Sequence, residues 1–174
     1  MPEKTIFLLI GQKGSGKSFI GNLFDKHFHI PFIRVEDWAK NIIRKRKPDD
    51  DAYIQEVFLA IENGIRKEMQ KKQKLVFESL GLSAAFETML NKLKVDFEVI
   101  TIKIKADPQI CLTRVKTRDQ SIHVNISDKQ MEKINKQFLD KNFNTDFVIE
   151  NTSRNNFEII NEIESILNSL KSKQ

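Results

Sequence analysis

The sequence predicts a single α/β domain in which five parallel strands are covered by helices on both faces. Short apolar runs alternate along the chain with segments whose apolar residues recur every three or four positions, and this alternation is typical of a parallel sheet with helical crossovers. The 174 residues suit one domain, and hydrophobic and charged fractions of 40% and 30% exclude a disordered or coiled-coil protein. Because no repeat or linker divides the chain, we expect one domain over residues 1–174.

The first half of the chain holds three of the predicted strands. Nearly continuous apolar runs predict them at residues 4–10, 30–35 and 75–77. The spacing of apolar residues predicts helices at residues 18–26, 36–47 and 52–70. Pro48 is expected to end the second of these helices because proline cannot continue the backbone hydrogen bonds.

The second half of the chain continues the alternation of helices and strands. Ser83 is expected to cap a helix that runs to about residue 93, and Asp107-Pro108 has the cap and first-turn proline of another helix start. Ser127 and Gln130 have the spacing of a capping box. The remaining apolar patterns predict strands at residues 97–105 and 147–149 and a terminal helix over residues 159–170.

A glycine-rich segment between the first predicted strand and helix matches the full phosphate-binding loop pattern. It consists of Gly11, Gln12, Lys13, Gly14, Ser15, Gly16, Lys17 and Ser18. Glycines let successive backbone N–H groups point inward as an anion nest, and the following helix N-terminus adds partial positive charge. Lys17 is expected to bridge the outer phosphates of ATP, and the Ser18 hydroxyl to bind Mg²⁺.

With this loop and a short arginine-bearing segment after the fourth strand, the chain resembles P-loop small-molecule kinases of the nucleoside monophosphate kinase and shikimate kinase group. The resemblance covers nearly the whole length. It implies a three-layer P-loop NTPase fold with the sheet order 2-3-1-4-5, ATP and magnesium as cosubstrates, and a phosphate acceptor opposite the loop. It also implies a lid at about residues 117–127, too short to form a separate lid domain.

In kinases of this group the end of the second strand often supplies an acidic residue that orients or deprotonates the acceptor hydroxyl. Glu36 and Asp37 occupy that region, and Asp37 is the preferred base. Either residue has an alternative role as a cap of the helix that begins there. A nucleoside monophosphate kinase would instead hold an acceptor phosphate with arginines, for which Arg34, Arg44 and Arg46 are available.

Glu78 follows the third predicted strand, so it lies at the edge where open parallel sheets place their ligands. The resemblance implies that this carboxylate binds the acceptor, holds magnesium or acts as a base. The next residues, Ser79, Leu80 and Gly81, lack both the triple glycine of shikimate kinases and the arginine common in deoxynucleoside kinases. The sequence therefore leaves the acceptor open.

Three arginines are candidates for contact with the nucleotide. Arg114 and Arg118 are four residues apart, so they share one face at the end of their helix. The resemblance implies that both neutralise charge on the phosphoryl group during transfer. Arg154, after the last strand, lies where this group lines the adenine.

The charge and cysteine content limit the partners and the compartment. A net charge of +5 favours phosphorylated ligands, whereas the interleaving of basic and acidic residues does not favour nucleic acid. A single cysteine, Cys111, excludes a disulfide framework and is expected in the core. The absence of a long apolar run predicts a cytoplasmic protein without membrane contact, expected as a monomer or weak homodimer.

The sequence predicts transfer of the γ-phosphate of ATP to a small hydroxyl or phosphate acceptor, such as a nucleoside, nucleotide or metabolite. Two alternatives remain open. One is a nucleotide-binding NTPase switch that phosphorylates nothing, and the other is a polynucleotide 5′-hydroxyl kinase. A requirement for an acceptor in ATP turnover separates the kinases from the switch.

Overall fold

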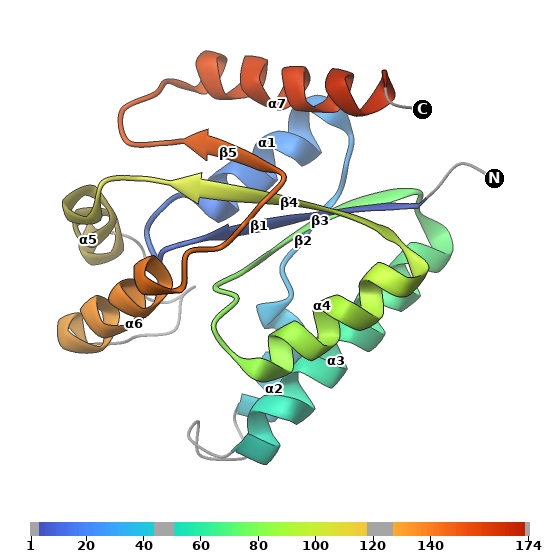
Figure 1. The fold of residues 1–174 in the computed structure, drawn as a ribbon, viewed down its shortest axis with the longest axis horizontal. Coiled ribbons are helices and arrows are strands. Elements are labelled where there is room, and N and C mark those ends of the chain that lie inside the picture. The colour runs from blue at the N-terminus through green and yellow to red at the C-terminus, as the bar shows by residue number, and fades with distance from the viewer. Residues whose placement is uncertain (1–3, 44–50, 118–126, 173–174) are drawn as a thin grey trace.

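The computed structural model describes residues 4–43, 51–117 and 127–172, and its strands form one parallel sheet (Figure 1). The order is β2-β3-β1-β4-β5, which confirms the predicted topology. The strands are β1 (Thr5–Gly11), β2 (Phe32–Ile33), β3 (Lys74–Ser79), β4 (Glu98–Lys105) and β5 (Phe147–Glu150). The helices are α1 (Lys17–Phe28), α2 (Glu36–Ile43), α3 (Asp51–Lys71), α4 (Ala84–Asp96), α5 (Pro108–Thr117), α6 (Asp128–Lys141) and α7 (Asn156–Lys171).

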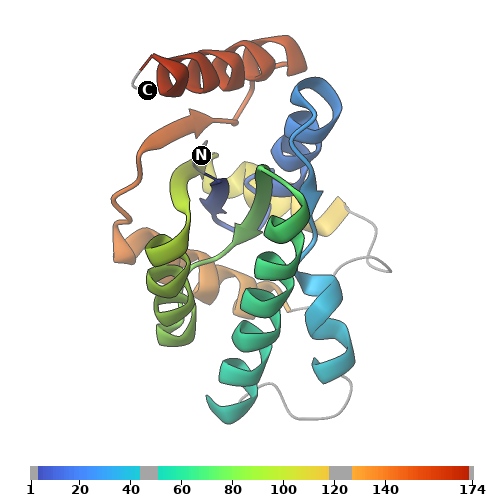
Figure 2. The same cartoon turned by 90° about the vertical axis from the view of Figure 1, so that its right-hand side faces the viewer.

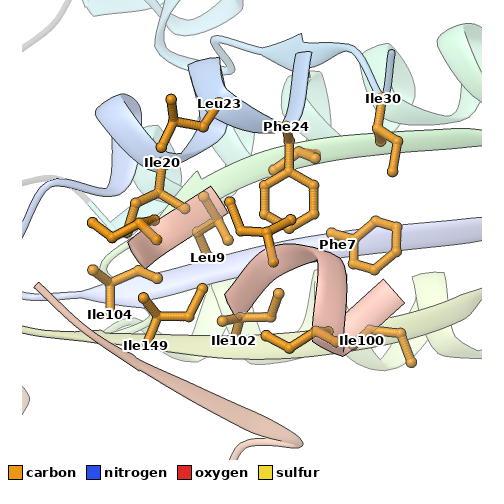
Figure 3. Packing of buried hydrophobic residues seen from close by; sticks show 14 residues of the cluster. Phe7, Leu9, Ile20, Leu23, Phe24, Ile30, Ile100, Ile102, Ile104 and Ile149 are labelled. Atoms are coloured by element: carbon orange, nitrogen blue, oxygen red, sulfur yellow. The ribbon is translucent and has the colours of Figure 1, made fainter. Parts of the chain in front are cut away.

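Helices cover both faces of the sheet and produce three layers. Helices α1 and α7 lie on one face, and α2, α3 and α4 lie on the other (Figures 1 and 2). The central strand β1 is buried along its whole length and alternates its side chains between the two layers. Phe7 and Leu9 join the apolar cluster under α1 and α7 (Figure 3), whereas Ile6, Leu8 and Ile10 join the cluster under α3 and α4.

The second strand is shorter than predicted. Only Phe32 and Ile33 pair with β3, although the apolar run covers residues 30–35. The Ile30 N–H is used by the end of α1, where it donates to the Phe24 carbonyl, and Pro31 has no N–H to donate. The Arg34 carbonyl already accepts a turn hydrogen bond that leads into α2. The predicted remainder of that helix, residues 44–47, lies outside the described residues.

The predicted helix starts are confirmed by their side-chain caps. Ser83 Oγ accepts from the Phe86 N–H at 3.1 Å, and Asp107 Oδ1 accepts from the Gln109 N–H at 2.8 Å. Ser127 forms both hydrogen bonds of a capping box. Within the part of the chain that the structure describes, no helix is long and apolar enough to cross a membrane.

Candidate active site

The phosphate loop leaves the carboxyl end of β1 and leads directly into α1. Leu9 and Ile10 are paired with Glu78 and Ser79 of β3, so the acidic end of β3 lies beside the start of the loop. This is the strand edge at which parallel α/β sheets bind their ligands. The sequence therefore places the loop and Glu78 at one site, as the topology predicts.

Two loop glycines are required by their backbone conformation and by close packing. Gly14 has a φ of +84° and Gly16 a φ of +96°, in the left-handed region that disfavours other residues. A Cβ on Gly14 would lie 2.2 Å from the carbonyl oxygen of Cys111, and one on Gly16 would lie 2.2 Å from Nδ2 of Asn151. The loop thus takes its shape against α5 and the end of β5.

The carbonyl groups of residues 11–16 all accept hydrogen bonds within the described structure. Lys17 Nζ donates to the carbonyls of Gly11 at 2.8 Å and Gln12 at 2.9 Å. The other donors are Asn135 Nδ2 to Lys13, Arg114 Nη1 to Gly14, Asn151 Nδ2 to Ser15 and the Ile20 N–H to Gly16. The Lys13 N–H donates to Asn135 and the Ser15 N–H donates to the Gln12 carbonyl, so the other loop amides are the candidates to bind an anion.

Lys17 and Ser18 lie side by side at the start of α1. Although part of the Lys17 side chain meets solvent, burial of its ammonium group lowers its pKa, against the opposing effect of the nearby Glu78 carboxylate. The Ser18 hydroxyl donates to Glu78 Oε1 at 2.6 Å. A hydroxyl and a carboxylate in contact provide the hard oxygen ligands that Mg²⁺ prefers, so these two side chains fit the predicted metal role.

A pocket of about 310 Å³ adjoins the loop and brings several predicted site residues together. Its lining includes Lys13, Gly14, Gly16, Lys17, Ser18, Phe19, Glu36, Glu78, Ser79, Leu80 and Arg114. Glu36 is close enough to Lys17 to oppose the lowering of the lysine pKa. A larger cavity of about 550 Å³ surrounds the start of β3 at the opposite end of the strands, away from this chemistry.

Asp37, the preferred base, is absent from the described pocket lining. Its carboxylate instead pairs with Lys40 of the same helix at 2.6 Å, and both side chains are about half exposed. One residue along a helix turns a side chain by about 100°, so only one member of the pair faces the loop. In the structure, Glu36 is the member of the pair that lines the pocket.

The three candidate arginines differ in placement. The Arg114 guanidinium lines the pocket and donates to the carbonyls of Asn151, at 2.8 Å, and of Gly14 and Ser15, each at 3.4 Å. Arg154 forms an ion pair with Glu162 of α7 and does not line the described pocket. Arg118 and most of the predicted lid lie outside the described residues.

Two asparagines that hold the loop, Asn135 and Asn151, were not predicted from the sequence. Asn135 lies in the apolar stripe of α6 with Met131 and Phe138, and a polar residue within such a stripe was the available signal. Asn151 follows β5 and is buried, but its position in the sequence carries no comparable signal. Both contact residues more than 100 positions away along the chain.

The order of the parallel sheet, the phosphate loop after β1 and the pocket at the strand ends define a P-loop kinase fold. The family model for shikimate kinase matches residues 13–168. The chain belongs to the shikimate kinase family.

Individual relatives agree with this assignment. A shikimate kinase of Clostridium beijerinckii is 31% identical over 81 residues, a match that covers 47% of each protein, about half the length of that curated relative. A gluconokinase structure from Sinorhizobium meliloti has a TM-score of 0.68 at 16% identity, covering 99% of this chain and 97% of that one. A shikimate kinase structure from Aquifex aeolicus has a TM-score of 0.62 at 21% identity and covers 97% of both chains. At these identities the structural likenesses establish the fold.

Proposed function

We propose that this protein is an ATP-dependent kinase that transfers the γ-phosphate to a hydroxyl group of a small molecule. The observation that carries the proposal is a complete phosphate loop that shares one pocket with the carboxylates of Glu36 and Glu78. Phosphoryl transfer needs the nucleotide phosphates and the acceptor hydroxyl in line, with charge stabilised around them. The loop supplies the first requirement, and we propose that the acceptor approaches beside the two carboxylates.

In this proposal the loop amides and Lys17 bind the ATP phosphates, while Ser18 and Glu78 hold Mg²⁺, Glu78 either directly or through water. When bound, the metal would neutralise phosphate charge. Lys17 would exchange its hydrogen bonds with the Gly11 and Gln12 carbonyls for contact with the outer phosphates. Arg114 lies next to the same loop and would oppose the charge that develops during transfer.

Glu36 is the proposed acceptor base, because it lines the pocket and lies near Lys17. Its carboxylate would accept the hydroxyl proton as the acceptor oxygen attacks the γ-phosphorus. Asp37 remains a candidate only if its pairing with Lys40 is exchanged for acceptor contact. We also propose that the protein acts in the cytoplasm as a monomer or weak homodimer.

The acceptor is proposed to be a hydroxyl compound and is not assumed to be shikimate. The proposed acceptor side of the pocket is lined by Ser79 and Leu80, and Gly81 follows them in the sequence. Shikimate kinases carry three glycines in this segment. The added side chains of Ser79 and Leu80 narrow this side of the pocket and give it one hydroxyl and one apolar group. We propose a polyol or sugar acid as the class of acceptor.

The test is ADP release by the purified protein with Mg-ATP and a panel of shikimate, gluconate, neutral sugars, nucleosides and a 5′-hydroxyl oligonucleotide. A kinase of the proposed class releases ADP only with one small acceptor and yields its phosphate ester. ADP release without any acceptor would replace the proposal with an NTPase switch. Phosphorylation of the oligonucleotide alone would replace it with a polynucleotide kinase.

Glu36→Gln and Asp37→Asn then assign the base. Each substitution keeps the size of the side chain and removes its charge. We expect Glu36→Gln to lower kcat with the identified acceptor by about 100-fold or more, the range for loss of a general base, and Asp37→Asn to stay within about threefold. The reverse pattern would return the role to Asp37.

A further inference from the structure

A buried asparagine outside the phosphate-loop motif holds one residue of the loop at both of its backbone polar groups. Asn135 of α6 has only 7% of its surface exposed. The N–H of Lys13 donates to Asn135 Oδ1 at 2.9 Å, and Asn135 Nδ2 donates to the Lys13 carbonyl at 3.2 Å. One side-chain amide thus satisfies both backbone groups of one loop residue.

This two-point contact fixes orientation as well as position. A single hydrogen bond would let the Lys13 backbone rotate about it, whereas two bonds to a planar amide define its direction. The asparagine itself is anchored, because Met131 and Phe138 on either side along α6 are buried. The side chain that holds Lys13 therefore belongs to a packed helix, and movement of Lys13 would require loss of both hydrogen bonds or displacement of α6.

We infer that Asn135 is a positioning residue for the nucleotide phosphates. It occupies the Lys13 N–H and turns the Lys13 carbonyl away. The Ser15 N–H donates to the Gln12 carbonyl, so the amides of Gly14 and of residues 16–18 are the ones presented to the anion. The loop is then already ordered in the folded protein. Ligand binding therefore does not incur the conformational entropy cost of ordering the loop. This inference rests on the proposed function, because it requires that the loop binds phosphates.

The experiment compares Asn135→Ala and Asn135→Leu with wild type and with Gln137→Ala. Leucine has the same branching of side-chain heavy atoms as asparagine, adds no charge and suits the apolar stripe of α6. Gln137 is an exposed amide on the same helix and serves as the matched control. Folding is checked by circular dichroism, and affinities for Mg-ATP, Mg-tripolyphosphate and adenosine are measured by calorimetry.

We expect both Asn135 variants to bind Mg-ATP and Mg-tripolyphosphate about tenfold more weakly, equivalent to roughly 1.4 kcal/mol, with adenosine affinity unchanged. Gln137→Ala should match wild type for all three ligands. A folded Leu variant that binds tripolyphosphate within twofold of wild type would overturn the inference, and so would an equal loss for adenosine, because that pattern indicates general loosening. If wild type binds neither phosphate ligand, the proposed function itself fails.

Discussion

Replacing Lys17 with methionine tests the central electrostatic interaction of the proposed nucleotide site. The two side chains have similar length, so the change removes the ammonium and keeps most of the packing. In the structure this ammonium already donates to the carbonyls of Gly11 at 2.8 Å and Gln12 at 2.9 Å. Binding of phosphate therefore exchanges existing hydrogen bonds for stronger ones.

The expected loss of Mg-ATP binding free energy follows from that exchange of hydrogen bonds. A unit charge about 4 Å from a phosphate charge gains about 4 kcal/mol at an effective dielectric constant of 20. Part of this is offset by the two carbonyl hydrogen bonds that Lys17 gives up, which leaves roughly 1.5–3 kcal/mol, typical of one hydrogen bond to a charged group. We expect Lys17→Met to weaken Mg-ATP binding by about 10- to 150-fold.

Calorimetric titration with Mg-ATP measures this loss, and Lys26→Met is the control. Lys26 is an exposed lysine in the last turn of the same helix, so its substitution changes the net charge equally. It should leave the dissociation constant within about twofold, because its charge is screened by solvent. Equal affinities of wild type and a folded Lys17→Met protein would refute the assignment of Lys17.

The remaining predictions concern pH, the loop glycine and a helix contact. Burial lowers the pKa of Lys17, and only its protonated form attracts phosphate, so Mg-ATP affinity should be full below the lowered pKa and fall as pH rises through it, with no such fall in Lys17→Met. Between the lowered pKa and the usual lysine pKa, Lys17 is protonated in the unfolded chain and deprotonated in the folded protein. The free energy of unfolding without ligand should therefore rise with pH in this range, as measured by urea titrations. Gly16→Ala puts an L-residue at a φ of +96° and 2.2 Å from Nδ2 of Asn151, and urea denaturation should show a loss of about 2–3 kcal/mol; a change below about 0.5 kcal/mol would contradict the close approach. Gly64→Ala should lack the usual helix gain of about 1 kcal/mol, because its Cβ would meet the Trp38 ring at 2.5 Å, and an unaltered tryptophan emission spectrum would count against this contact.

The alternation of apolar runs was sufficient to predict the sheet because strands buried on both faces have a distinctive composition. Sheet order came from the family resemblance. The length of β2 could not be predicted, since Ile30 is as apolar as a strand residue but its N–H is committed to the Phe24 carbonyl. That competition between a helix end and a strand depends on how the chain leaves α1.

Within the candidate site, local sequence predicted the loop and Glu78, but it favoured Asp37 as the base, whereas Glu36 is the residue that lines the pocket. The two carboxylates are chemically alike and adjacent, and the direction in which α2 leaves the sheet decides which one meets the pocket. The asparagines that hold the loop are far from it in the sequence: Asn135 lies 122 positions from Lys13, and Asn151 lies 136 positions from Ser15. Contacts of that span arise from the packing of distant elements, which no local pattern encodes.

The single cysteine provides a chemical probe of local opening beside the phosphate loop. Cys111 is fully buried, its carbonyl oxygen lies against Gly14, and burial raises the pKa of its thiol. A thiol reagent therefore reacts only when the packing of α5 against the loop and α6 opens, and the labelling rate of the natural protein reports how often that opening occurs. Opening of this one region can be timed in the unmodified chain, with no competing thiol elsewhere in the sequence.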